Sequence, residues 1–371
     1  MKQVFIFGKP VNDEAFTDRE TESARLKANF GSGINTFIIS PRRWGKTSLV
    51  KKVIKESGND GISYVFADIF KAKTSVEFCE ILGNAILKQT SSAFEEILSI
   101  TQRFLGRINV GINLSPDRAN PLKLQFGIGE EQKSMEEILM LPQRIAEKKK
   151  TDIVICIDEF QQIAEFEDSM TFQKQLRTIW QHQENVTYCL FGSKRHMMEA
   201  LFDDESKPFY KFGDILYLKT IPLSYWIPFI SKKFSSADKT ITDEQIKRIC
   251  ETVEYHSSYV QQLCWYVYLF SGSSVTEDDI ENGIQELVEQ NTALFESRTE
   301  NLTPLQMRFL RAVSDGISDG FSTANVISKY KLGSSAGSVA TRKAMLEKGL
   351  VYLEDDRIKL SDPVLGLWMK M

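Results

Sequence analysis

Histidine and cysteine are both scarce in this sequence, and their placing excludes several kinds of site. The chain of 371 residues has three His and five Cys. No two cysteines form a C-x-x-C pair, and their odd number and scattered positions do not suit a zinc site or a disulfide framework. We therefore expect reduced, buried thiols in a cytosolic protein, and no histidine-based metal site.

Long apolar runs and an excess of one charge are also missing. No stretch approaches the roughly 18 apolar residues that a membrane-spanning helix needs. The apolar run at the N-terminus, Val4–Phe7, is too short for a signal peptide. The 46 basic and 50 acidic residues leave a net charge of −4, so any contact with nucleic acid must come from a local basic surface. We expect a cytoplasmic protein with no membrane partner.

Short apolar runs alternate with longer helix-like segments over the first 220 residues. The runs are rich in Ile, Val, Phe and Tyr and almost continuously apolar, which is typical of strands covered on both faces in a parallel sheet. The segments between them are long enough for crossover helices. The pattern predicts a doubly wound α/β domain. The expected strands lie at 36–40, 63–69, 153–157, 187–191 and 215–218.

Three further features complete the predicted domain organisation. Residues 108–128 alternate apolar and polar side chains, which predicts a two-stranded antiparallel insertion whose role is open and which can be merely decorative. After Pro222 the strand signals stop, and helices are expected at 241–254, 257–271 and 276–298. Thr303-Pro304 is a typical helix start and opens a third unit. The expected domains are 1–220, 221–300 and 301–371.

A phosphate-binding loop is predicted where the first strand ends. Residues 40–47 read Ser-Pro-Arg-Arg-Trp-Gly-Lys-Thr, between a strand and a helix-like segment. Gly45 would let the backbone approach phosphate, Lys46 would reach the β- and γ-phosphates, and the Thr47 hydroxyl could bind Mg²⁺. The usual motif begins with glycine; Ser40 can serve if its φ stays negative. The residues expected to bind nucleotide here are Ser40, Pro41, Arg42, Arg43, Trp44, Gly45, Lys46, Thr47 and Ser48.

Two carboxylates follow another apolar strand and complement this loop. Ile153–Ile157 is followed by Asp158 and Glu159. At the carboxyl end of a parallel strand, Asp158 would hold Mg²⁺ through its water shell, and Glu159 would orient and deprotonate an attacking water. A solvated acidic turn is the alternative. Because the loop (Walker A) and the acidic pair (Walker B) each require the other, together they predict binding and hydrolysis of ATP.

A polar turn follows the next strand. Ser193, directly after Phe191-Gly192, could sense the γ-phosphate from beside the acidic strand, and Lys194 and Arg195 could stabilise charge on phosphate. A plain Gly-Ser turn with basic surface residues would have the same sequence. We therefore assign catalytic roles to Lys46, Glu159 and Ser193, and no arginine finger.

These residues resemble those of a known family. The likeness is to the archaeal-type ATPases of the STAND branch, which are related to AAA+ proteins and origin-recognition initiators, and it spans nearly the whole chain. The string Arg-Arg-x-Gly-Lys-Thr-Ser-Leu is its most specific part. The matching segments are Phe16–Glu20, Pro41–Leu49, Ile157–Phe160, Phe191–Ser193 and Leu360–Trp368.

The resemblance implies a five-stranded sheet with the phosphate-loop strand inside it. It also implies that Phe16 and Arg19 lie near the adenine, which the residues alone would not indicate. The family's lid usually has a Gly-x-Pro-type turn before a helix, and Tyr255-His256-Ser257 replaces it here. His256 could take over nucleotide sensing, or could be a capping or surface histidine.

The C-terminal residues predict a winged-helix module. Helices are expected at 305–313, 323–330 and 335–348, followed by two short strands around the acidic turn Glu354–Asp356. In the third helix we expect Val339 and Leu346 on the apolar face, and Ser338 and Met345 on another face. Residues 301–371 hold ten basic and seven acidic side chains, and the acidic turn would be repelled by DNA phosphate. DNA binding and a structural or protein-docking role both stay open.

Together these observations predict an ATP-dependent molecular switch. ATP and Mg²⁺ would bind at Lys46, Thr47 and Asp158, slow hydrolysis would depend on Glu159, and the γ-phosphate would bias the lid and winged helix. The alternative is a DNA-binding regulator that ATP only stabilises. Protein partners and self-association are further expectations.

Overall fold

The computed structural model describes residues 4–9, 11, 16–58, 61–91, 96, 99, 100, 103, 110–114, 122–126 and 131–371. The chain divides into two compact units, which we describe separately. The α/β unit comprises Arg19–Arg42 and Lys46–Leu218. The helical unit comprises Met1–Asp18, Arg43–Gly45 and Lys219–Met371. Among the described residues, no helix combines the length and the apolar character needed to cross a membrane.

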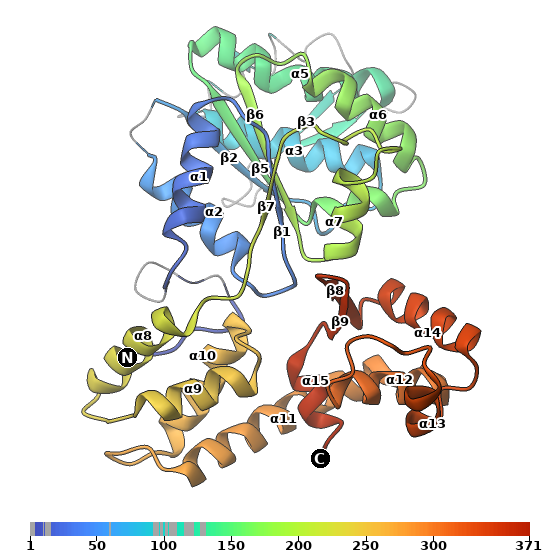
Figure 1. Cartoon of the computed structure of the whole chain (residues 1–371). Helices are drawn as coiled ribbons and strands as arrows, with labels where there is room; N and C mark the ends of the chain where they lie inside the picture. The colour runs from blue at the N-terminus through green and yellow to red at the C-terminus, as the bar shows by residue number, and fades with distance from the viewer. Residues whose placement is uncertain are drawn as a thin grey trace. The chain divides into compact units, whose positions relative to one another are not determined.

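A five-stranded parallel sheet forms the centre of the α/β unit (Figure 1), as the sequence predicts. Its strands lie in the order β2-β5-β6-β1-β7, so β1 is flanked by β6 and β7. Every residue of β1, β5 and β6 is buried, which explains their continuous apolar character. The strands are β1 Thr36–Ile39, β2 Ser63–Asp68, β5 Ile153–Asp158, β6 Val186–Gly192 and β7 Asp214–Tyr217.

Helices cover both faces of this sheet, with α1 and α2 on one side and α6 and α7 on the other (Figure 1). Aromatic side chains fill the face below α6 and α7: Phe37 stacks on Phe202 with ring centroids 3.8 Å apart, and Trp180 on Tyr188 at 3.9 Å. The helices are α1 Glu20–Gly31, α2 Lys46–Glu56, α3 Ser75–Thr90, α5 Glu131–Lys149, α6 Ser169–Trp180 and α7 Arg195–Phe202, with a 3₁₀ helix η2 at Phe160–Glu165.

The predicted insertion is an antiparallel pair of strands. β3 (Val110–Leu114) pairs with β4 (Leu122–Phe126) along their whole length. This confirms the prediction from alternating residues, and β4 approaches α3 in the α/β unit.

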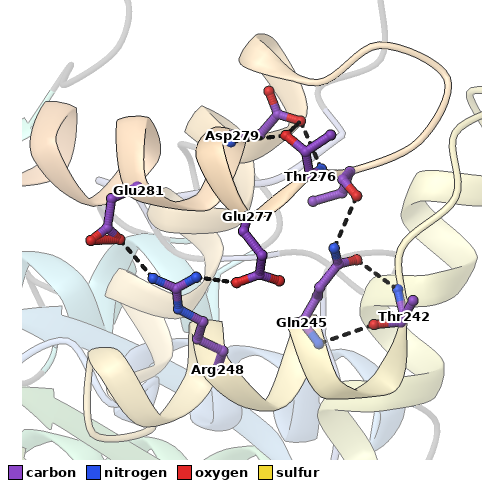
Figure 2. Close-up of polar contacts among 8 residues, drawn as sticks. Thr242, Gln245, Arg248, Thr276, Glu277, Asp279 and Glu281 are labelled. Carbon is purple, nitrogen blue, oxygen red and sulfur yellow. Dashed lines mark hydrogen bonds and ion pairs between the residues drawn. The ribbon is translucent and has the colours of Figure 1, made fainter.

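The first part of the helical unit contains the helices predicted from 241 to 298. Threonine capping boxes start α9 and α11, at Thr242 and Thr276 (Figure 2). Gln245 closes the first box and also donates to the Val275 carbonyl at 2.9 Å, while Arg248 pairs with two glutamates of α11, so the two helices are joined by polar contacts. The helices are α8 Leu223–Ser235, α9 Asp243–Thr252, α10 Ser257–Phe270 and α11 Glu277–Thr299.

The second part is a winged-helix arrangement, as predicted. Thr303 and Pro304 start its first helix with a further capping box. The two wing strands pair antiparallel around the acidic turn. The elements are α12 Pro304–Ser314, α13 Ala324–Tyr330, α14 Ser335–Glu347, β8 Val351–Glu354, β9 Arg357–Leu360 and α15 Pro363–Trp368.

The predicted faces of α14 are wrong. Ser338 and Met345 are fully buried, whereas Val339 is 57% exposed. The Ser338 hydroxyl donates to the Phe321 carbonyl at 2.7 Å, which removes the usual cost of burying a serine. A serine whose hydroxyl is hydrogen-bonded can therefore lie in the core, at a position where a sequence pattern predicts an aliphatic residue.

Two other predictions also need correction. His256 lies at the N-cap of α10, but its side chain makes no capping bond and is buried, with its ring 4.6 Å from that of Tyr259. It is thus neither a capping nor a surface histidine. The N-terminal segment was expected within the first domain, but Phe5 packs in the helical unit against Phe234 and Tyr268.

Candidate functional site

The phosphate-loop sequence connects β1 to α2, as its motif requires. Ser40 follows β1 directly, is buried, and keeps a φ outside the left-handed region, so it meets the condition for replacing glycine. Arg43 and Gly45 have φ values of 64° and 92°. A side chain at Gly45 would be strained in this conformation, although nothing lies within 4 Å of the place where its Cβ would be. Glycine at 45 therefore serves the backbone turn.

Lys46 begins α2 and is held by its own loop. Its Nζ donates to the Ser40 carbonyl at 3.0 Å, to the Ser40 hydroxyl at 3.1 Å and to the Pro41 carbonyl at 2.9 Å. Burial lowers the pKa of the ammonium to about 8, and Asp158 and Glu159 act in the opposite direction. A buried cation with three neutral acceptors is suited to bind a polyanion, which would supply the missing negative charge.

Asp158, at the end of β5, is hydrogen-bonded to Thr47, in the first turn of α2. The Thr47 hydroxyl donates to Asp158 Oδ2 at 2.7 Å, and the backbone N–H of Glu159 donates to Oδ1 at 2.9 Å. Burial raises the pKa of Asp158 to about 6; the Thr47 bond opposes this shift, and Glu159 adds to it. Asp68, at the end of β2, is in register with Asp158 and is a further acidic neighbour.

Glu159 leaves β5 in a left-handed conformation, with φ 57°. Its Oε2 accepts two hydrogen bonds, from Gln161 Nε2 at 2.5 Å and from the Ser193 hydroxyl at 2.8 Å. Non-glycine residues with positive φ are uncommon and concentrate at functional sites. The strand end thus places a carboxylate between donors from two adjacent segments of chain.

Thr47 and Asp158 fit a magnesium ion by their chemistry. Mg²⁺ prefers hard oxygen ligands and is usually held by one or two protein groups together with water and substrate phosphate. A hydroxyl and a carboxylate already in contact, the carboxylate with a pKa raised by burial, provide such a pair. In the part of the chain that the structure describes, no cluster of three His, Cys, Asp or Glu offers a separate metal site.

The structure brings the predicted residues Lys46, Thr47, Asp158, Glu159 and Ser193 together in the α/β unit through the contacts above. Three other predicted residues, Arg19, Lys194 and Arg195, form ion pairs with glutamates. Arg19 is 3% exposed and pairs with Glu22 at 2.8 Å; Lys194 pairs with Glu165, and Arg195 with Glu199. Phe16 is half-buried and belongs to the helical unit, so the adenine contact of Phe16 and Arg19 stays a prediction.

Sequence reasoning missed Gln161 and the reason for Gly192. Gln161 is 1% exposed, and its side chain occupies the space where a side chain of Gly192 would begin. The sequence holds no signal that separates Gln161 from the adjacent Gln162.

Comparison with protein families gives two matches. Residues 16–263 match a family described as an ATPase domain predominantly from Archaea. The chain belongs to this archaeal ATPase family. Residues 293–371 of the ATPase match a probable winged helix domain. A search of curated protein sequences gave no match.

Solved structures show the same fold. The Walker-type ATPase paby2304 of Pyrococcus abyssi is 17% identical, with a TM-score of 0.71 and 100% of both chains covered. The ORC2 protein of Aeropyrum pernix, in ADPNP-ADP complexes, is 12% identical, with a TM-score of 0.57 and 100% and 98% covered. The ORC1 protein of Aeropyrum pernix, in complex with DNA, is 10% identical, with a TM-score of 0.50 and 96% and 93% covered.

Proposed function

We propose that this archaeal-type ATPase is a STAND/AAA+-like molecular switch that binds ATP with Mg²⁺ and hydrolyses it slowly. The observation that carries the proposal is the contact between Thr47 and Asp158 at 2.7 Å, next to a glutamate whose carboxylate is held in place. Two motifs separated by more than 100 residues thus meet at one edge of the sheet, where parallel α/β folds bind their ligands.

Each residue has a distinct role in this proposal. Lys46 would exchange the oxygens of its own loop for those of the β- and γ-phosphates, and the loop amides and the start of α2 would bind further phosphate oxygens. Thr47 and Asp158 would hold Mg²⁺, which when bound neutralises charge on the phosphates. Glu159 would accept a proton from the attacking water, and Ser193 would sense the γ-phosphate. Phe16 and Arg19 would contact the adenine.

The test separates nucleotide binding from hydrolysis. Lys46→Ala is expected to lose most ATP affinity, measured by titration with a fluorescent ATP analogue. Glu159→Gln is expected to keep ATP affinity and to lose turnover by about 10²–10⁴-fold, as for removal of a general base. Lys174→Ala and Glu167→Gln change exposed residues of the same charges and serve as controls. Wild-type affinity and turnover in both site variants would refute the proposal.

The switch would act through the helical unit. We propose that the γ-phosphate biases the arrangement of the lid (residues 221–300) and the winged helix (residues 301–371), and thereby the binding of a partner protein or a second copy of the chain. A pull-down that compares ATP-bound Glu159→Gln with nucleotide-free protein tests this step. The same proteins recovered in equal amounts from both states would contradict nucleotide control.

A DNA-binding regulator is the second candidate. It is supported by the winged-helix match at residues 293–371 and by the likeness to the ORC1 protein, whose solved structure contains DNA. In this case the third helix, α14, would contact the duplex and ATP would mainly stabilise the fold. Duplex binding measured over a range of salt concentrations tests it. Absence of binding at low salt, with and without ATP, would eliminate this candidate.

A further inference from the structure

We propose that Gln161 is a positioning residue which, together with Ser193, fixes Glu159 in the orientation needed to accept a proton from water. This inference rests on the proposed ATP hydrolysis and deepens it, because it adds a residue that acts through the catalytic carboxylate. The roles of Ser193 and Glu159 come from the motifs, whereas Gln161 comes only from the contacts in the structure.

The two donors reach Glu159 from different segments of the chain. Gln161 lies in η2, immediately after β5, and its Nε2 donates to Glu159 Oε2 at 2.5 Å. Ser193 follows β6, the neighbouring strand, and its hydroxyl donates to the same Oε2 at 2.8 Å. Since both bonds end on one oxygen, rotation of the carboxylate is restricted from two directions.

The other carboxylate oxygen is left for chemistry. Among the described residues, Glu159 Oε1 has no hydrogen-bond partner, and the side chain is only half-buried. A general base needs one oxygen within hydrogen-bond reach of the water that it deprotonates. Holding one oxygen by two donors while the other has no bonded partner among the described residues is an arrangement that pre-orients the base and reduces the freedom it must lose in the reaction.

The orientation of the Gln161 amide follows from the chemistry of its partner. An ionised carboxylate only accepts hydrogen bonds, so the NH₂ group must face Glu159 and the carbonyl must point away. That carbonyl oxygen, Oε1, is buried and has no partner among the described residues. An unsatisfied buried acceptor destabilises a fold, so the contribution of Gln161 to stability does not explain its presence.

Gly192 makes room for this amide. A Cβ at position 192 would lie 1.7 Å from Gln161 Oε1 and 2.9 Å from its Cδ. The φ of Gly192 is outside the left-handed region, so the backbone itself would accept any residue. The need for glycine between Phe191 and Ser193 is therefore steric. It is set mainly by Gln161, and Met198 Sδ at 3.1 Å from the added Cβ is a second close neighbour.

The main test replaces Gln161 with Leu, which has a similar volume and no donor. We expect kcat for ATP to fall by about 10- to 100-fold, while KM and nucleotide affinity change by less than about twofold, because only the orientation of the base is affected. Thermal unfolding is expected to show no loss of stability. Gln173→Leu is the matched control, since Gln173 is also 3% exposed or less and also has an unsatisfied Oε1, but donates to Ser169 in α6.

A second route displaces the amide without changing it. Gly192→Ala should push Gln161 away from Glu159 and give a similar loss of kcat, even if Gln161→Leu folds poorly. Gly31→Ala is its control, because no atom lies within 4 Å of the added Cβ and the φ there is not positive.

A double-mutant cycle tests whether Gln161 affects turnover through Glu159. In a Glu159→Gln background, Gln161→Leu should cause no further loss in single-turnover rate, because residues that act as a unit are not additive. A wild-type kcat for Gln161→Leu and Gly192→Ala, an equal loss in the Glu159→Gln background, or a parallel loss of nucleotide affinity would each overturn the inference. If Glu159→Gln itself turns over ATP normally, the proposed function fails instead.

Discussion

The α/β unit and the winged helix differ in how far their charged side chains are buried. At the strand ends of the α/β unit, Lys46 and Asp158 are 6% and 8% exposed and are bonded to named partners. In the winged helix, Lys343 pairs with Glu347 while both side chains are largely exposed. Burial shifts the pKa values of Lys46 and Asp158, so the chemistry of these two side chains depends on the surrounding protein.

This difference indicates where single substitutions should matter. Exposed ion pairs contribute little to stability or function, whereas buried polar groups have large effects when one partner is removed. The wing turn adds a second contrast, since Asp355 and Asp356 both have positive φ and belong to an acidic surface rather than a site with bonded partners. Three experiments test this difference between the α/β unit and the winged helix.

The largest effect is expected at Asp158. If Asp158 holds Mg²⁺ as proposed, Asp158→Asn should lower ATP turnover by about 100-fold or more, because such a carboxylate is worth several kcal/mol. Asp356→Asn removes a carboxylate of the wing and should change turnover by less than about twofold. Steady-state assays at saturating Mg²⁺ measure both. Equal effects of the two substitutions would remove the distinction between the regions.

The same substitution, Asp158→Asn, should have a pH-dependent effect on the free energy of unfolding. The pKa of Asp158 is raised to about 6, so the folded protein holds this proton more tightly than the unfolded chain does. The resulting stabilisation is full below the ordinary value of 3.8 and is lost as the pH rises through about 6.

Above that pH the Asn variant should be the more stable protein by about 1–3 kcal/mol, and the difference should vanish near pH 4. The amide can replace both contacts, since the Thr47 hydroxyl can also accept a bond. Urea unfolding at about pH 4.5 and about pH 7.5 measures the difference. A gap that is independent of pH would contradict the assigned cause.

The smallest effect concerns the wing. If the winged helix faces DNA, the double substitution Asp355→Asn and Asp356→Asn should increase duplex affinity by roughly three- to tenfold at low salt, because it removes repulsion from phosphate. Glu289→Gln with Glu296→Gln, on exposed positions of α11, is the control with an equal change of charge. Fluorescence anisotropy measures all three proteins, and an unchanged affinity would place the wing away from DNA.

The fold could be predicted from sequence where the physical signal is local and strong. The central strands β1, β5 and β6 were identified because burial on both faces leaves almost no polar residue within them. Thr303-Pro304 marked the start of α12 because a hydroxyl cap and a proline suit the first turn of a helix. The contact between Thr47 and Asp158 followed from the rule that the carboxyl ends of parallel strands meet at one edge.

The failures share another cause, which is that the partner of a polar group is not visible in a single sequence. Ser338 was assigned to a face other than the apolar one, yet it is buried and its hydroxyl donates to a carbonyl 17 residues away. His256 was expected to be a capping or surface residue if it does not sense nucleotide, yet it is buried beside Tyr259. Gln161 was passed over because neither its bond to Glu159 nor the space left for it by Gly192, 31 residues later, is visible in the sequence.

The segment from Asp158 to Gln161 is one uninterrupted stretch of four residues that includes the proposed metal ligand, the proposed base and one of the two donors to its carboxylate. Any displacement of that stretch moves these three groups together. Ser193 follows a different strand, β6, so its bond to Glu159 would change in length if β5 and β6 slid past each other. A vibrational probe on the Glu159 carboxylate would therefore register relative movement of two strands as a change in one hydrogen bond.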